Sequence, residues 1–196
     1  MPKTSMDQIR ELRQKTGAGV MDAKEVLEET KGDIEKAIEL LRKKGQKISV
    51  EKQSREAKEG WIGHYVHTNG KVAALVELYC ETDFVARNAE FKELAHNIAM
   101  QIVALNPSYL SPQDVPEKEK EKEREIYREQ IKNEKKSQNI IDKIVEGKLS
   151  KFYSEICLLK QPYFQDEKIT VEDLVTEKIS KLGEKIEIGK FVRLNL

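Results

Sequence analysis

The hydrophobic pattern of this chain changes its period near Gly60, so one polypeptide combines two kinds of secondary structure. In the first quarter of the chain, apolar side chains recur at the intervals of amphipathic helices. After Gly60, two β-rich runs at 61–67 and 71–79 flank an Asn69-Gly70 pair. Asn-Gly between such runs favours a type I′ hairpin turn, in which both central residues take positive φ. The sequence therefore predicts an α+β protein.

Residues 1–45 are predicted to form a compact module of three helices. Ser5 and Gln8 have the spacing of a capping box for the first helix. Asp33 is a natural N-cap for the third helix, and Gly45 is expected to end it. The apolar residues at helical spacing are Ile9, Leu12, Val20, Ala23, Val26, Leu27, Ile34, Ala37, Ile38 and Leu41.

Residues 46–59 are polar and basic, and we expect a linker or an exposed helix there. In the core that follows, strand 71–79 is apolar on both faces, which predicts a central strand covered on both sides. The alternation from Ile186 to Leu196 predicts a last strand that returns to the hairpin and completes a three-stranded antiparallel sheet. Helices that pack on this sheet, including a helical hairpin, are expected over 91–103, 117–136, 140–156 and 171–182, and the charged segment 117–136 is expected to be exposed.

Charge and hydropathy limit the classes of function. The 196 residues carry 35 basic and 35 acidic side chains, so the formal net charge is zero. Nucleic-acid-binding domains are usually clearly basic, and direct nucleic-acid binding is therefore not expected. No apolar run approaches the roughly 20 residues of a transmembrane helix, and residues 1–20 contain no signal-peptide core. These features predict a cytoplasmic protein that makes no membrane contact.

Residue types that usually perform catalysis are few and poorly arranged. His64 and His67 are three residues apart on a predicted strand, so they face opposite sides and cannot share a metal without distortion. Cys80 and Cys157 are isolated in the sequence, and no general base can be placed beside either thiol. We expect buried, unreactive cysteines, no catalytic residue, no cofactor and no metal site, and hence a protein that is not an enzyme.

The segment 81–88 is unusual for a turn between a buried strand and an amphipathic helix. Phe84 and Val85 form a large apolar pair beside the carboxylate of Asp83, where polar turn residues are typical. One interpretation, which periodicity alone favours, is that Asp83 or Asn88 caps the helix and Phe84 packs onto its first turn. The other is that Asp83 and Phe84 project outward into a partner protein, as an aromatic anchor beside a charge often does.

Two long motifs, in the right order, resemble signatures of the elongation factor Ts family. Residues 12–27 read LRQKTGAGVMDAKEVL and are similar to the N-terminal signature, and residues 77–87 read ELYCETDFVAR and are similar to the second. Tyr79 departs from the second motif, where the family usually has Asn, which affects the expected hydrogen bonding at the strand end. Residues 91–101 and 161–164 are also similar, so the resemblance spans nearly the whole chain.

This resemblance implies a guanine-nucleotide exchange factor for elongation factor Tu, the GTPase that delivers aminoacyl-tRNA to the ribosome. The protein would bind this partner in its GDP-bound and nucleotide-free states. Residues 1–45 would be a UBA-like domain, 46–59 a basic linker, and 60–196 the core and dimerisation domain. The residues that the resemblance places against the partner are Arg13, Val20, Met21, Thr82, Asp83, Phe84 and Val85, with Asp83 and Phe84 beside its Mg²⁺ site.

The resemblance also bears on the oligomeric state, because the chain is short for this family. A short member could supply the second half of the core by forming a homodimer. The apolar faces of strand 71–79 and helix 140–156 are candidate interfaces, although a monomeric core would bury them equally well.

Two other functions stay open at this point. Basic residues between positions 42 and 58 could form an RNA- or ribosome-binding module, whose affinity would fall steeply with salt. A solvated linker face explains the same residues. The N-terminal module alone would also suit a protein that binds ubiquitin-like folds, but analogy of fold is weak support for a function. The basic residues are Arg42, Lys43, Lys44, Lys47, Lys52, Arg55 and Lys58.

Overall fold

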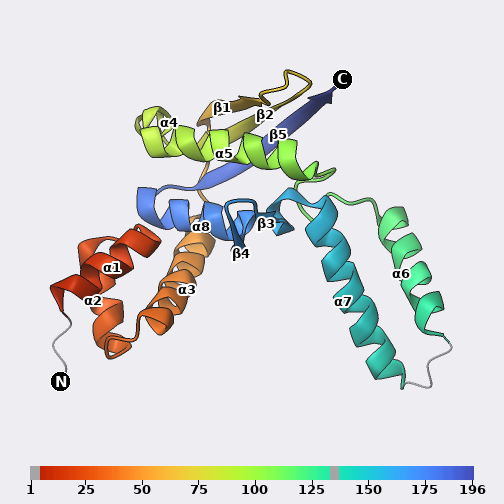
Figure 1. Ribbon diagram of the computed structural model, residues 1–196, viewed down its shortest axis with the longest axis horizontal. Coiled ribbons are helices and arrows are strands. Elements are labelled where there is room, and N and C mark those ends of the chain that lie inside the picture. Colours follow the sequence, from red (N-terminus) through yellow and green to blue (C-terminus); the bar gives the residue numbers. More distant parts are fainter. Residues whose placement is uncertain (1–4, 133–136) are drawn as a thin grey trace. The chain divides into compact units, whose positions relative to one another are not determined.

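The structure, a computed structural model, describes residues 5–132 and 137–196 (Figure 1). It divides into two compact units. The first contains the chain up to Trp61 together with Leu78–Lys92 and Asp173–Glu187, and the second contains Ile62–Glu77, Glu93–Glu172 and Ile188–Leu196. Neither unit is a continuous segment of the chain.

The N-terminal part of the first unit is helical, as predicted. Ser5 and Gln8 form the capping box: Gln8 N donates to Ser5 Oγ at 3.2 Å, and Ser5 N donates to Gln8 Oε1 at 3.0 Å. The side chain of Asp33 caps the third helix by accepting from Lys36 N at 3.1 Å. The helices are α1 (Met6–Thr16), α2 (Val20–Glu29) and α3 (Ile34–Lys52).

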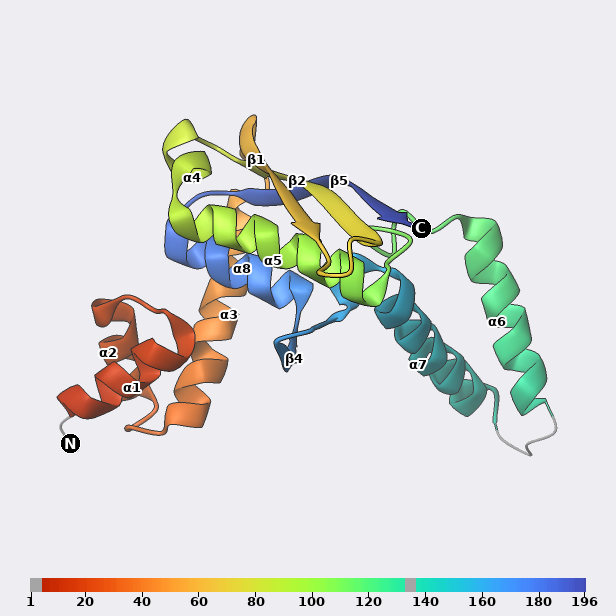
Figure 2. The same ribbon diagram turned by 45° about the horizontal axis from the view of Figure 1, so that its top comes forward.

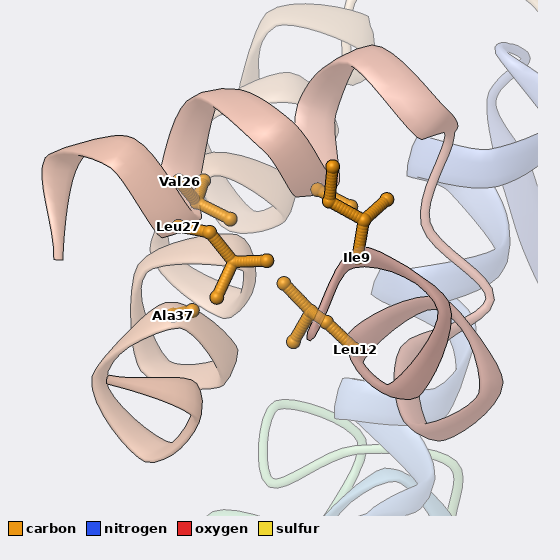
Figure 3. Packing of buried hydrophobic residues seen from close by; sticks show 6 residues of the cluster. Ile9, Leu12, Val26, Leu27 and Ala37 are labelled. Atoms are coloured by element: carbon orange, nitrogen blue, oxygen red, sulfur yellow. The ribbon is translucent and has the colours of Figure 1, made fainter. Parts of the chain in front are cut away.

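A single small apolar cluster joins these three helices (Figure 3). Leu12 and Leu27 are fully buried in it, and each buried leucine contributes roughly 2 kcal/mol relative to an exposed one. Val20, whose spacing matches the apolar positions of these helices, is 45% exposed at the start of α2. The buried members are Ile9, Leu12, Ala23, Val26, Leu27 and Ala37.

The prediction that Gly45 ends the third helix is wrong, because α3 continues to Lys52. Gly45 is buried in the middle of the helix. A Cβ at this position would lie 3.7 Å from side-chain carbons of both Thr176 and Ser180, which belong to α8 (Val171–Leu182). The glycine therefore allows α3 and α8 to approach each other, and of the two alternatives for residues 46–59, the helix holds for residues 46–52.

A three-stranded sheet with β2 at its centre confirms the expected fold class. Leu196 N donates to Lys71 O at 3.0 Å and Lys190 N donates to Glu77 Oε2 at 2.9 Å, so the last strand runs antiparallel to the second strand of the hairpin, as predicted. One face of β2 is buried, but Leu75 on the other face is 48% exposed. The expectation that both faces are covered is therefore wrong. The strands are β1 (Glu59–Val66), β2 (Val72–Cys80) and β5 (Ile186–Asn195), in the order β1-β2-β5.

The turn between β1 and β2 is not the predicted type I′ turn. Gly70 has a φ of 67°, whereas Asn69 does not take positive φ. Gly70 N donates to His67 O at 2.8 Å, and His67 N donates to Val72 O at 2.8 Å. This pattern is that of a type I turn followed by a left-handed residue. Asn69 Oδ1 instead accepts from Lys71 N at 2.9 Å, which holds the asparagine in this alternative turn.

Helix α5 (Ala89–Leu105) lies along one face of the sheet (Figure 2). A Cβ on Gly63 would lie only 2.3 Å from the carbonyl oxygen of Ala95, so the absence of a side chain on β1 allows this packing. His96 Nδ1 lies 2.9 Å from His64 O across the same contact. The predicted apolar stripe of this helix is confirmed by the burial of Phe91, Leu94, Ala95, Ile98, Ala99 and Ile102.

The second unit also contains the predicted helical hairpin, α6 (Glu117–Ile131) and α7 (Gln138–Ile156), which run side by side in both views (Figures 1 and 2). Ile131, Val145 and Leu149 form its buried seam. The part of the predicted charged helix at 133–136 lies outside the described residues. A short hairpin of β3 (Pro162–Tyr163) and β4 (Asp166–Thr170), preceded by a 3₁₀ turn at Leu158–Lys160, was not predicted.

Substitution of Gly147 by alanine is expected to stabilise the protein by about 0.5–1 kcal/mol. Gly147 lies on the exposed face of α7, and a Cβ there meets no atom within 4 Å. Urea unfolding measures the change. Gly70→Ala is the matched control: a Cβ also meets nothing within 4 Å, but the φ of 67° makes this substitution destabilising. Equal effects of the two substitutions would contradict the argument from backbone conformation.

Candidate functional site

The segment that follows β2 contains a short helix where a turn was expected, α4 (Asp83–Arg87). Thr82 is its N-cap: the hydroxyl oxygen accepts from Val85 N at 3.4 Å, and the carbonyl oxygen accepts from Ala86 N at 3.1 Å. Cys80, the last residue of β2, donates from Sγ to the same carbonyl oxygen at 3.2 Å. The hydroxyl and the carbonyl oxygen of Thr82 therefore both hold the start of the helix.

Two carboxylates join this segment to the loop between α8 and β5, and we call this pair, Glu81 and Glu184, the carboxylate clamp. Glu184 Oε2 accepts from the backbone nitrogens of Glu81 and Thr82, both at 3.0 Å, and Oε1 accepts from Thr82 Oγ1 at 2.6 Å. In the other direction, Glu81 Oε1 accepts from Lys185 N at 2.6 Å. Hydrogen bonds accepted by a carboxylate on each segment thus connect the end of β2 with the loop between α8 and β5.

Glu81 is also the electrostatic centre of this region. The donated backbone N–H of Lys185 and the guanidinium of Arg55, whose Nη1 lies 3.2 Å from Oε2, lower the pKa of the Glu81 carboxyl. The carboxylate of Glu81 therefore stays ionised at a lower pH than an ordinary glutamate, and its contacts with Lys185 and Arg55 are retained there.

The aromatic ring of Phe84 points away from the protein and is 84% exposed. The interpretation that this ring packs onto the helix is therefore wrong. Asp83 is not the cap either, since its carboxylate pairs with Arg87 at 3.0 Å, one turn along α4. Asn88 Oδ1 accepts from Glu90 N at 2.8 Å, so Asn88, which was the other predicted cap, caps the start of α5. Asp83 and Val85, on either side of Phe84 in the sequence, are half-buried.

The remaining predicted site residues lie around the turn between α1 and α2. Gly17 ends α1 with a φ of 66°, and Arg13 Nε donates to the carbonyl oxygen of Ala18 at 3.2 Å, which fixes this turn. Val20 and Met21 follow on the first turn of α2 and are 45% and 74% exposed. The structure thus presents two groups of exposed residues in the first unit, one on α2 and one on α4.

Both cysteines are buried and free, as expected. Burial raises the pKa of the Cys80 thiol and of the Cys157 thiol to about 11. Among the described residues, no group of three or more histidine, cysteine or acidic side chains is arranged to hold a metal ion.

We expect neither thiol to react with Ellman's reagent in the folded protein at about pH 8, since thiolates are the reactive species. Both should react once the protein is unfolded in urea. The pKa of each thiol is about 11 in the folded state against 9.0 as its ordinary value, so the unfolded state loses its protons first. Stability should therefore fall as the pH rises through this interval. Rapid reaction of one thiol in the native protein would contradict the assigned burial.

Several basic side chains between positions 42 and 58 have partners within the protein. Lys44 pairs with Glu25 at 3.1 Å, and Lys58 pairs with Glu56 at 2.9 Å. Arg55 belongs to the clamp region, and Lys52 donates from Nζ to a carbonyl oxygen in the loop after α8. These contacts give four of the seven basic residues a partner within the protein.

The sequence did not predict the role of Glu184, one of the two carboxylates of the clamp. Glu184 lies 102 positions from Thr82 in the chain, within a short turn that carries no motif. A residue in such a turn gives no periodic signal, because its role depends on a contact made only in the folded protein.

Aromatic side chains are enriched in protein–protein interfaces, and Phe84 is an exposed aromatic side chain on a short helix. No helix in the described part of the chain is both long enough and apolar enough to span a membrane. The family model described as "Elongation factor TS" matches residues 4–196. The chain belongs to the elongation factor Ts family.

Curated relatives support this membership at high identity. The elongation factor Ts of Nitratidesulfovibrio vulgaris is 53% identical over 188 residues, which is 96% of this chain and 94% of the relative. The proteins of the same name from Thermotoga neapolitana and Fervidobacterium nodosum are 53% identical over 191 residues and 50% identical over 196 residues. These matches cover 97% and 98% of this chain and 96% and 98% of the relatives.

Proposed function

We propose that this protein is a guanine-nucleotide exchange factor in translation elongation, which binds elongation factor Tu and promotes release of GDP. The observation that carries the proposal is the 84% exposure of Phe84 on a helix that the clamp holds in place. Exchange of this kind requires no covalent chemistry, and the cytoplasm is its proposed setting.

The proposed mechanism acts on the partner's Mg²⁺ and phosphate site. GDP is held largely by Mg²⁺ and by backbone N–H groups around its phosphates, so a displacement of this shell weakens nucleotide binding strongly. The ring of Phe84 would wedge between elements of the partner, and burying it there contributes roughly 2–3 kcal/mol. The neighbouring carboxylate of Asp83 would disturb the hydrogen bonds near the ion. Thr82 and Val85 would flank this contact.

The three N-terminal helices would supply a second contact, to the nucleotide-binding domain of the partner. The exposed side chains of Val20 and Met21 are apolar groups on the first turn of a helix, and Arg13 lies beside them at the α1–α2 turn. In functional terms we propose a UBA-like domain at 1–45, a basic linker at 46–59, and a core and dimerisation domain at 60–196.

The proposal is tested by the release of a fluorescent GDP analogue from elongation factor Tu. Catalytic amounts of this protein should accelerate release, and the complex should separate when excess GDP and Mg²⁺ are added. Separation follows from linkage: if the factor lowers the affinity for GDP, then GDP lowers the affinity for the factor to the same extent. Release at the uncatalysed rate would refute the proposal. Neither RNA binding nor binding of ubiquitin-like folds predicts acceleration.

We further propose that the protein acts as a homodimer. All three strands of the β1-β2-β5 sheet expose large apolar side chains, including Ile62 at 53%, Leu75 at 48% and Leu194 at 65%. Such residues, when contiguous, mark protein–protein contacts in soluble proteins. Light scattering at micromolar concentration should report twice the mass of the chain, and a monomer at that concentration would rule the dimer out.

A further inference from the structure

We propose that Glu184 is a positioning residue for the exchange contact: its carboxylate sets the direction of α4 and hence the place of the Phe84 ring. This inference rests on the proposed function, since the ring is useful only if it enters the partner at a fixed angle. Neither of the two sequence signatures contains Glu184, and the structure alone brings it to the site.

The first step of the argument is that α4 cannot fix its own direction. It has five residues, far fewer than a helix needs for stability in isolation. Ala86 is its one residue assigned to the core, and the largest side chain, Phe84, lies in solvent. Packing therefore contributes little to the direction of this helix, which must come from the polar contacts at its ends.

The second step is that Glu184 supplies the strongest of these contacts. Its carboxylate accepts three hydrogen bonds at 2.6–3.0 Å, two of them from consecutive backbone nitrogens and one from the hydroxyl of the N-cap, Thr82. Hydrogen bonds to an ionised acceptor are roughly twice as strong as neutral ones. The two backbone bonds orient the peptides on either side of Glu81, and the hydroxyl bond holds the N-cap residue, so together they set the direction in which α4 leaves the strand.

The third step separates positioning from general stability. Glu184 is bonded to the strand exit and the N-cap, not to the apolar core. Loss of its carboxylate should therefore free α4 locally while the sheet and the helical packing persist. Binding through the rest of the surface would remain, but the ring would no longer reach the Mg²⁺ site reliably. The saturating rate of GDP release should fall more than the affinity.

The experiment compares Glu184→Ala and Glu184→Gln with the control Glu187→Gln. Glu187 is a nearby exposed carboxylate that pairs with Lys185 and makes no contact with Thr82. We expect Glu184→Ala to lower the saturating release rate about tenfold or more, since misplacement by about 1 Å can cost that much. The concentration of factor for half-maximal effect should change little. The saturating release rate of Glu184→Gln, which keeps one acceptor oxygen, should lie between those of Glu184→Ala and the wild type. The control Glu187→Gln should have the wild-type rate.

Substitutions of Thr82 provide a second, independent test of the proposal. Thr82→Ser keeps the hydroxyl that donates to Glu184, and Thr82→Val removes it. Valine should lower the release rate more than serine does. Combining Thr82→Val with Glu184→Ala should cost less than the sum of the two effects, as expected for residues that act through one contact. Additive effects, or equal losses with serine and valine, would overturn the proposal.

Amide hydrogen exchange followed by mass spectrometry measures how firmly the α4 segment is held in the absence of a partner. In Glu184→Ala, peptides that cover Glu81 to Arg87 should exchange faster, whereas peptides from α5 and α7 should be unchanged. Unchanged exchange in the α4 region would overturn the proposal whatever the release rates show. If the wild-type protein fails to accelerate GDP release, the proposed function falls, and hydrogen exchange alone then decides whether Glu184 orients α4.

Discussion

Replacement of Phe84 by alanine is expected to lower the saturating rate of stimulated GDP release about 30-fold, as loss of a hot-spot contact worth roughly 2 kcal/mol would do. The ring is 84% exposed, so its removal leaves no cavity in the core. Surface substitutions of this kind usually change stability by less than about 0.5 kcal/mol. Stopped-flow measurement with a fluorescent nucleotide gives the rate, and urea unfolding gives the stability.

Two further variants make the Phe84 result specific. Val50→Ala is a matched control, because Val50 is a 64% exposed apolar side chain on α3, away from the α4 segment in sequence. It should leave the release rate unchanged. Phe84→Leu keeps apolar bulk without the flat ring and should give an intermediate rate. If the alanine variant is folded and as fast as the wild type, Phe84 is not the wedge, even if the protein proves to be an exchange factor.

Local periodicity was enough to predict most elements of the fold. The helix at Val171–Leu182 has the predicted bounds, and β2 has the predicted central place in the sheet. Both follow from patterns within a few consecutive residues, because a helix or strand that buries one face must repeat its apolar residues at a fixed interval. The intervals therefore located these elements correctly, although the same patterns misjudged the burial of Val20 and of the second face of β2.

The incorrect predictions have a different cause, which is a contact outside the repeating pattern, either distant, as for Gly45, or local, as for Asn69. Gly45 has the composition of a helix end, but close packing against Thr176 keeps it inside α3. Asn69 suits a type I′ turn, but its side chain caps Lys71 N and another turn forms. A single sequence does not reveal which of two locally acceptable conformations the rest of the protein stabilises.

The candidate site shows the same division between local and distant determinants. The outward projection of Phe84 was one of two interpretations that the residues left open, and only the fold decides between them. The clamp was not predictable at all, because Glu184 is identified by the three donors around it and not by its neighbours in sequence. The roles of Asp83, Arg13 and Met21 in partner binding stay predictions.

Replacement of Leu27 by alanine should have the largest effect on stability, because Leu27 is fully buried in the small cluster that joins α1, α2 and α3. Such substitutions cost about 2–5 kcal/mol through lost burial and the cavity that remains. A core of six buried side chains gives these helices a small free energy of unfolding. We therefore expect them to unfold locally at moderate temperature in this variant. Circular dichroism melts and hydrogen exchange of peptides from α1 and α2 measure this.

The functional consequence of Leu27→Ala should be opposite in kind to that of Phe84→Ala. If α1–α3 hold one of two contacts with elongation factor Tu, partial unfolding lowers the fraction of competent factor and weakens apparent affinity by that fraction. The half-maximal concentration should rise while the saturating release rate is retained, because α4 and the clamp are intact. Met21→Ala, a change at a 74% exposed position, should weaken affinity without lowering the melting temperature. A Leu27→Ala variant that melts early but binds normally would show that the N-terminal helices make no contact with the partner.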